Sequence, residues 1–107
     1  GILAAIAIPK FANTKEKAYI AAMKSDLRNL VTAEEAYFSD SVKYTTDINA
    51  LKFKPSTGVG SPSITVGAGF WTAQVAHTQV TGKSCEIAVN TNNSLVTSAG
   101  DGEPACK

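Results

Sequence analysis

A long stretch of this sequence, from Lys10 to Tyr44, contains neither glycine nor proline. Apolar side chains recur along it at spacings of three and four, the period that places them on one face of an α-helix. Several alanines in the same stretch add strong helix propensity. We therefore expect an amphipathic helix over residues 10–40, ending near Ser39–Ser41, where serine and aspartate side chains compete for backbone hydrogen bonds. The stripe on its apolar face comprises Tyr19, Met23, Leu27, Leu30 and Tyr37, together with Glu34.

The residues ahead of this helix, Gly1 to Ile8, are wholly apolar. Eight residues cannot span a bilayer, which takes about 20, so we expect further apolar residues upstream. We interpret residues 1–9 as the remnant of an apolar helix in a membrane or a filament core. Pro9 removes one backbone donor and predicts a kink or break where the polar chain begins. The candidate assembly residues in this segment are Gly1, Ile2, Leu3, Ile6, Ile8, Pro9 and Phe11.

The helical pattern does not continue into residues 41–107. Their pattern predicts a head made of a loop and a small β-sheet. Pro55, Gly58, Gly60 and Pro62 punctuate an irregular segment over residues 42–62. Alternating patterns then indicate strands at 70–77 and 84–90, a turn at 81–83 between them, a short strand at 94–98 and a further one at 63–66. One long helix followed by short antiparallel strands is an α+β order, with three or four strands in the sheet.

The helix can bury its stripe only against the inward face of that sheet. The strand alternation predicts that the core unites Met23, Leu27, Leu30 and Tyr37 of the helix with Trp71, Ala73, Val75, Ile87 and Val89 of the sheet. It also turns Glu86, Ala88 and Asn90 outward. Two cysteines, Cys85 and Cys106, lie near the C-terminus without CxxC spacing. We interpret them as one disulfide in an oxidising compartment, the alternative being a pair of buried free thiols.

The charge balance argues against nucleic acid as the main partner. Ten basic and nine acidic residues give a formal charge of +1, too little for a polyanion-binding surface. The helix nevertheless carries charges that are candidates for pairing between subunits. Glu34 would need a partner of its own on the apolar stripe, for which Arg28 or a lysine is a candidate. The full candidate set is Lys15, Lys17, Lys24, Arg28, Glu34 and Glu35.

The sequence contains no constellation that predicts catalysis, a metal or a cofactor. His77 is the only histidine and no G-x-S-x-G motif accompanies the serines. Glu34 and Glu35 are adjacent, so they point about 100° apart on a helix and form no acid/base pair. Asp101-Gly102-Glu103 offers two carboxylates, too few for Ca²⁺, and fits a solvated turn better. The glycine pairs open no helix and match no phosphate-binding motif.

The first 40 residues resemble the type IV pilin family. The resemblance rests on Gly1 to Pro9, which reads GILAAIAIP, on Lys10-Phe11, and on Ser25 to Leu30 with Thr32-Ala33 and Glu35 after it. The family's leader-cleavage site, methylated N-terminal residue and nearby acidic residue have no counterpart here. The resemblance implies a long helix packed on a small sheet with a C-terminal cysteine pair. It also implies a structural subunit without cofactors that joins copies of itself in a helical filament outside the cell.

Further expectations follow from the resemblance. Before assembly the subunit would be anchored in the inner membrane, and the pilus assembly machinery would then incorporate it. The family's filaments serve adhesion, twitching motility, DNA uptake or conduction. We expect Gly1–Pro9 to be helical in detergent and partly non-helical in a filament, because Gly1 and Pro9 both disfavour helix. The helix aromatics are interpreted as core and subunit contacts and not as an electron path.

Two alternatives remain open at this point. A major pseudopilin of a type II secretion system would share the fold, and a calcium-bound C-terminal loop would favour it, whereas a C-terminal disulfide favours a pilus. A secreted soluble binding domain would behave as a monomer without detergent.

Overall fold

The computed structural model describes the backbone of residues 2–107 and the side chains of residues 14–107. Helix α1 spans Ile2–Ser41, and the amide of Val42 closes its last turn on the carbonyl of Phe38 at 2.8 Å. The predicted C-terminal end of the helix is therefore confirmed. Of the kink or break expected at Pro9, a break is excluded, because α1 is continuous through that position. A proline removes only one intrahelical hydrogen bond, which a helix of this length can absorb.

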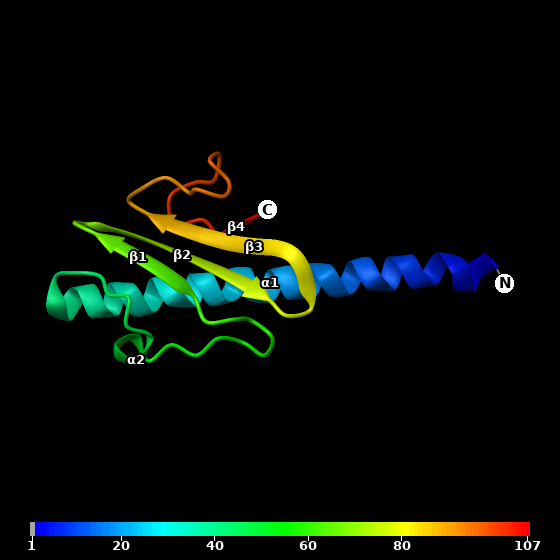
Figure 1. The fold of residues 1–107 in the computed structure, drawn as a ribbon, viewed down its shortest axis with the longest axis horizontal. Helices are drawn as coiled ribbons and strands as arrows, with labels where there is room; N and C mark the ends of the chain where they lie inside the picture. Colours follow the sequence, from blue (N-terminus) through cyan, green and yellow to red (C-terminus); the bar gives the residue numbers. More distant parts are fainter. Residues whose placement is uncertain (1) are drawn as a thin grey trace.

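The strands form one antiparallel sheet in the order β1-β2-β3-β4. Their bounds are Ser63–Gly67 for β1, Phe70–His77 for β2, Val80–Val89 for β3 and Ala105–Cys106 for β4. Figure 1 shows α1 along one face of this sheet and the segment between β3 and β4 on the other side. The first half of α1 extends well beyond the sheet, so the molecule is a head on a projecting helix (Figure 1). The α+β prediction, with three or four strands in the sheet, is confirmed.

Three details of the predicted sheet are wrong. The β2–β3 turn lies at Thr78–Gln79, because His77 pairs with Val80. The next pair is Ala76 with Ser84, so residues 81–83 form a bulge instead of the turn, and Gly82 has a φ of +78° that suits glycine. Residues 94–98 form no strand. The side chain of Asn93 accepts hydrogen bonds from the amides of residues 95 and 96 there, which makes a turn.

The segment from Val42 to Pro62 is more ordered than its composition predicts. It contains a four-residue helix, α2, over Ile48–Leu51. The side chain of Asp47 caps α2 by accepting hydrogen bonds from the amides of Asn49 and Ala50. A single bridge between Val59 and His77 ties the end of this segment to β2.

The core lies between α1 and the sheet. Met23, Leu27 and Leu30 are completely buried, as are Trp71, Ala73 and Ile87 of the sheet, with Val75 and Val89 nearly so. Tyr37 packs against this cluster but is only partly buried. The loop contributes residues that the helix-and-sheet pattern could not supply, namely Tyr44, Leu51 and Val59. The Tyr44 ring lies 4.8 Å from that of Phe38 and 6.2 Å from that of Trp71, which joins the helix end, loop and sheet.

Candidate functional site

Three buried carboxylates distinguish the interior of the head. Asp26, Glu34 and Glu86 are respectively 3%, 0% and 1% exposed. A buried carboxylate destabilises a fold unless hydrogen-bond donors surround it, and each of these three accepts bonds from a different loop. We call them the loop-fastening carboxylates.

Asp26 fastens the loop between α2 and β1. Its two carboxylate oxygens accept hydrogen bonds from the backbone amide and the hydroxyl of Ser56, both at 2.7 Å. Hydrogen bonds to a charged group contribute more than neutral ones, about 1.5–3 kcal/mol each. Asp26 lies three residues after Met23 and four before Leu30, so its helical spacing already placed it on the buried stripe.

Glu34 fastens the loop that follows α1. One carboxylate oxygen accepts a hydrogen bond from the backbone amide of Thr45 at 3.0 Å. The other is buried with no partner among the described residues. The expected partner, Arg28 or a lysine, is therefore replaced by a backbone N–H. Burial raises the pKa of Glu34 above its ordinary value of 4.5, the Thr45 hydrogen bond opposes this, and the neighbouring charge of Glu35 adds to it.

Glu35 lies beside Glu34 but faces outward and meets the same loop. Its carboxylate accepts a hydrogen bond from the hydroxyl of Tyr44 at 3.0 Å. The pKa of Tyr44 is raised above 10.0, first by burial of its ring and then by this bond to a carboxylate. The two adjacent glutamates thus hold consecutive parts of one loop and do no acid/base work.

Glu86 fastens the loop between β3 and β4. Its carboxylate accepts hydrogen bonds from the amide and the hydroxyl of Ser94, both at 2.6 Å, and from the side-chain amide of Gln74. The side chain of Asn93 donates to the Glu86 carbonyl at 2.9 Å. Glu86 and Ala88, which were predicted to point outward, are nevertheless buried, because this loop covers the outer face of β3. Strand alternation reports which face a residue occupies and cannot report what covers that face.

A disulfide joins Cys85 of β3 to Cys106 of β4, which confirms the predicted pairing. The two cysteines are also direct partners in the β3–β4 ladder. Beyond them, the amide of Lys107 donates to the carbonyl of Ser84 at 2.9 Å. The last residues of the chain are therefore fixed to the sheet both covalently and by backbone hydrogen bonds.

The head thus combines a long projecting helix, an antiparallel sheet and a loop closed by a C-terminal disulfide. A comparison with curated proteins finds the type IV major pilin protein PilA of Myxococcus xanthus (strain DK1622), 38% identical over 58 residues. The chain is therefore similar to the type IV pilin family, which is structural and not enzymatic. The matched residues are 54% of this chain and 26% of the relative, so the chain spans about a quarter of that relative's length.

No family model matches the chain, and no solved structure matches it. The similarity to the pilin family thus rests on the match to PilA, and the fold and the disulfide agree with it.

The predicted assembly residues, Gly1, Ile2, Leu3, Ile6, Ile8, Pro9 and Phe11, lie outside the residues whose side chains the structure describes. Among the predicted intersubunit charges, Lys15, Lys17, Arg28 and Glu35 are exposed and Lys24 is half-buried. Glu34 alone points into the head.

The residues considered for metal or catalytic chemistry have structural roles in the head. His77 is buried, stacks at 4.4 Å on the ring of Tyr19, and its Nδ1 accepts a hydrogen bond from the Gln79 amide at 3.0 Å. Asp101 accepts a hydrogen bond from the Asn90 amide and so closes the same loop that Glu86 holds. Over residues 14–107 no group of three or more His, Cys, Asp or Glu side chains is placed to hold a metal ion.

Val42, directly after α1, has a strained backbone conformation for which no contact within the head compensates. Its φ is +56°, a left-handed conformation that glycine adopts freely at helix ends and that a β-branched residue adopts at a cost of about 1–3 kcal/mol. Its side chain is 76% exposed, so burial within the monomer offsets little of this cost. The sequence signal was the absence of glycine or asparagine where the helix ends.

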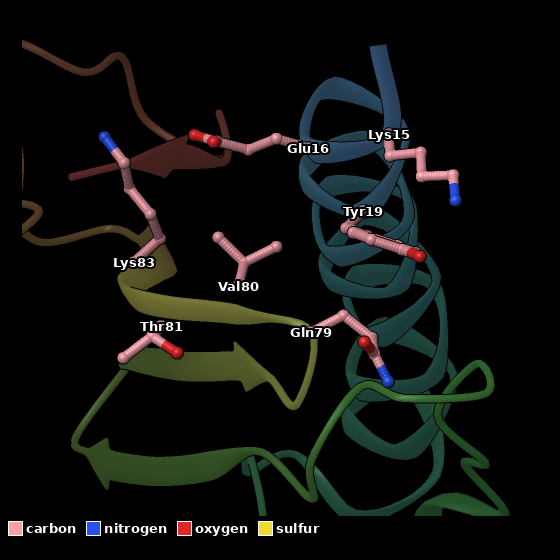
Figure 2. A pocket seen from close by; sticks show the side chains of 7 residues that line it. All are labelled: Lys15, Glu16, Tyr19, Gln79, Val80, Thr81 and Lys83. Atoms are coloured by element: carbon pink, nitrogen blue, oxygen red, sulfur yellow. The ribbon is translucent and has the colours of Figure 1, made fainter. Parts of the chain in front are cut away.

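At the opposite end of the head, a cavity of about 400 Å³ opens where α1 leaves the sheet. Figure 2 shows Val80 between α1 and β3, with Glu16 reaching from the helix and Lys83 from the strand. Val80 is 7% exposed and supplies an apolar floor. We call this opening the neck cavity; its lining residues are Lys15, Glu16, Tyr19, Gln79, Val80, Thr81 and Lys83.

Proposed function

We propose that this pilin is a structural subunit that polymerises into an extracellular filament of the type IV pilus kind through helix α1. The observation that carries the proposal is the projection of the first half of α1 beyond the head (Figure 1). A helix that the head leaves uncovered can pack against the same helix of neighbouring subunits. The apolar sequence of Gly1 to Ile8 suits the interior of such a bundle.

Before assembly, the apolar start of α1 holds the subunit in the inner membrane, and the pilus assembly machinery then transfers it to the filament. This transfer moves apolar side chains from lipid to a helix bundle, so close packing drives it more than release from water. Within the part of the chain whose side chains are described, no helix combines the length and apolar character that crossing a membrane requires.

The head forms the outer wall of the proposed filament, and its construction suits exposure outside the cell. A disulfide holds the C-terminus in an oxidising environment, and buried carboxylates hold three loops against the helix and sheet. The exposed charges Lys15, Lys17, Arg28 and Glu35 would meet neighbouring subunits and fix their register. Exposed pairs contribute less than about 1 kcal/mol each but act strongly on specificity.

The test is to identify the chain in filaments from the bacterium that makes it. Filaments sheared from the cells are examined by negative-stain electron microscopy and by mass spectrometry. The proposal expects the head peptides in the filament fraction and loss of the filaments when the gene is deleted. Recovery of the chain only as a soluble monomer, with filaments unchanged by the deletion, would contradict it.

A further inference from the structure

One end of the head carries an exposed apolar side chain, and the other end carries a cavity. Val42 is an exposed apolar side chain directly after the C-terminal end of α1. The neck cavity lies at the other end, beside the β2–β3 turn, where α1 leaves the sheet. Figure 1 shows these two ends separated by the length of the head along α1. A contact between them therefore joins two copies and cannot form within one.

We propose that Val42 of one pilin inserts into the neck cavity of the next copy, so that heads join end to end along the filament. This inference rests on the proposed filament function and names the head contact within it.

The backbone of Val42 supplies the first argument. A valine in the left-handed region is strained, and backbone strain of this kind is found mainly at functional sites. Glycine would close α1 at this position without that strain. Val42 is also by far the most exposed of the large apolar residues in the described part of the chain, at 76% against 36% for Val66. A second copy that buries this side chain accounts for both observations.

The charges around the two features supply the second argument. Asp40 and Lys43, one acid and one base, flank Val42 and are exposed. Glu16 and Lys83, again one acid and one base, flank the floor of the neck cavity (Figure 2). With Val42 inserted over Val80, the pairing that joins opposite charges is Asp40 with Lys83 and Lys43 with Glu16, and this is the orientation that we propose. The cavity, at about 400 Å³, is larger than a valine side chain and leaves room for these flanking groups.

The symmetry of this contact supplies the third argument. A projection at one end and a cavity at the other make a heterologous interface, which repeats indefinitely and generates an open filament unless its rotation closes a ring. The projecting half of α1 does not by itself specify how heads are spaced. A contact between head ends would fix the spacing of subunits along the filament.

Cysteine cross-linking in assembled filaments tests the contact directly. Val42→Cys and Thr81→Cys are introduced together into the full chain, and sheared filaments are oxidised and separated on a non-reducing gel. The proposal expects a ladder of covalent multimers from the pair and monomers from each single variant. The matched control pairs Val42→Cys with Thr65→Cys, an exposed residue of β1 away from the neck cavity, and gives no ladder.

Substitution of Val42 by glycine distinguishes the backbone strain of this residue in the monomer from its contact in the filament. Val42→Gly should raise the thermal midpoint of the head while lowering the amount of filament about tenfold or more, because the interface loses a buried valine. Lys52→Gly is the control, since Lys52 has a similar φ of +54° at the end of α2. It should leave filament yield unchanged.

The outcomes distinguish this inference from the proposed function. Filaments that contain the chain, give no ladder with the Val42/Thr81 pair and tolerate Val42→Gly overturn the contact and leave the filament function standing. A chain that is absent from filaments overturns the proposed function itself. Charge reversal provides a further check: Asp40→Lys and Lys83→Asp should each weaken the Val42/Thr81 cross-link, and the two together should restore it.

Discussion

We predict that the buried carboxylate of Glu34 lowers the free energy of unfolding of the head at neutral pH, because only one of its oxygens accepts a hydrogen bond. Its side chain is completely buried, one oxygen has no partner among the described residues, and its pKa is raised by burial. Replacing it by glutamine keeps the shape and an acceptor for the Thr45 amide but removes the charge. An unpaired buried polar atom costs about 1–3 kcal/mol, and more when it is charged. The side-chain NH2 of glutamine remains unpaired in place of that oxygen, so only the additional cost of the charge is removed. At pH 7–8 we therefore expect Glu34→Gln to raise the free energy of unfolding by about 1 kcal/mol.

The sign of the pH dependence follows from the raised pKa. The folded state holds the Glu34 proton more tightly than the unfolded state, in which the pKa is near 4.5. The stability linked to this proton is fully present below the unfolded value and is lost as pH rises through the folded value. Protonated glutamate and glutamine are nearly isosteric, so the two proteins should be about equally stable below pH 4.5. The advantage of the variant should appear only as pH rises.

Urea unfolding followed by fluorescence provides the assay, because Trp71 is the only tryptophan and is completely buried. Measurements between pH 4 and pH 8 give the stability difference as a function of pH. Glu35→Gln is the matched control, adjacent on the helix but exposed, and should lack this pH-dependent gain. Glu34→Ala should be destabilised at every pH, since it leaves the Thr45 amide unpaired. A stability difference for Glu34→Gln that is flat across the range, or negative at pH 8, would refute the reasoning.

Three other predictions concern the disulfide, the core and the helix surface. Cys106→Ser opens a loop with a sequence separation of 21, and should lower stability by about 3 kcal/mol in denaturant titrations; an unchanged midpoint would show that the loop is held without it. Leu30→Ala, at a completely buried position, should cost about 2–5 kcal/mol, whereas Val31→Ala, partly exposed on the same turn, should cost clearly less. Arg28→Glu, at an exposed position, should shift the unfolding midpoint little but reduce filament yield in imaging of cells, and equal loss of folding and filaments would argue against an intersubunit role.

The helix and its partners in the sheet could be predicted from the sequence because they follow simple periods. Spacings of three and four identified Met23, Leu27 and Leu30, and strict alternation identified Trp71 and Val75, all of which the structure buries. The helical spacing and the strand alternation were sufficient to identify these positions. The same period also contained Asp26, but an acidic residue on a helix is ordinarily solvated, and only the Ser56 loop 30 residues away reveals its role.

The sites that sequence analysis missed depend on contacts between segments that have no periodic pattern. The burial of Glu86 requires that residues 90–104 fold back over β3, which depends on the disulfide and on the Asn93 turn. The bulge at residues 81–83 depends on where β2 and β3 pair, and a glycine in a turn and a glycine in a bulge look alike in sequence. The neck cavity combines residues of α1 with residues of the β2–β3 hairpin.

The loop-fastening carboxylates have a consequence for how the surface of such a protein can diverge. Each of them accepts a hydrogen bond from a backbone amide, at Thr45, Ser56 and Ser94 respectively. A main-chain donor is present whatever side chain the residue bears, except in proline. The three loops can therefore change their outward-facing side chains while the main-chain hydrogen bonds that attach them to the head persist. Proline would remove the main-chain donor at any of the three positions, whereas at Ser56 and Ser94 the hydroxyl adds a second hydrogen bond that another side chain would lose.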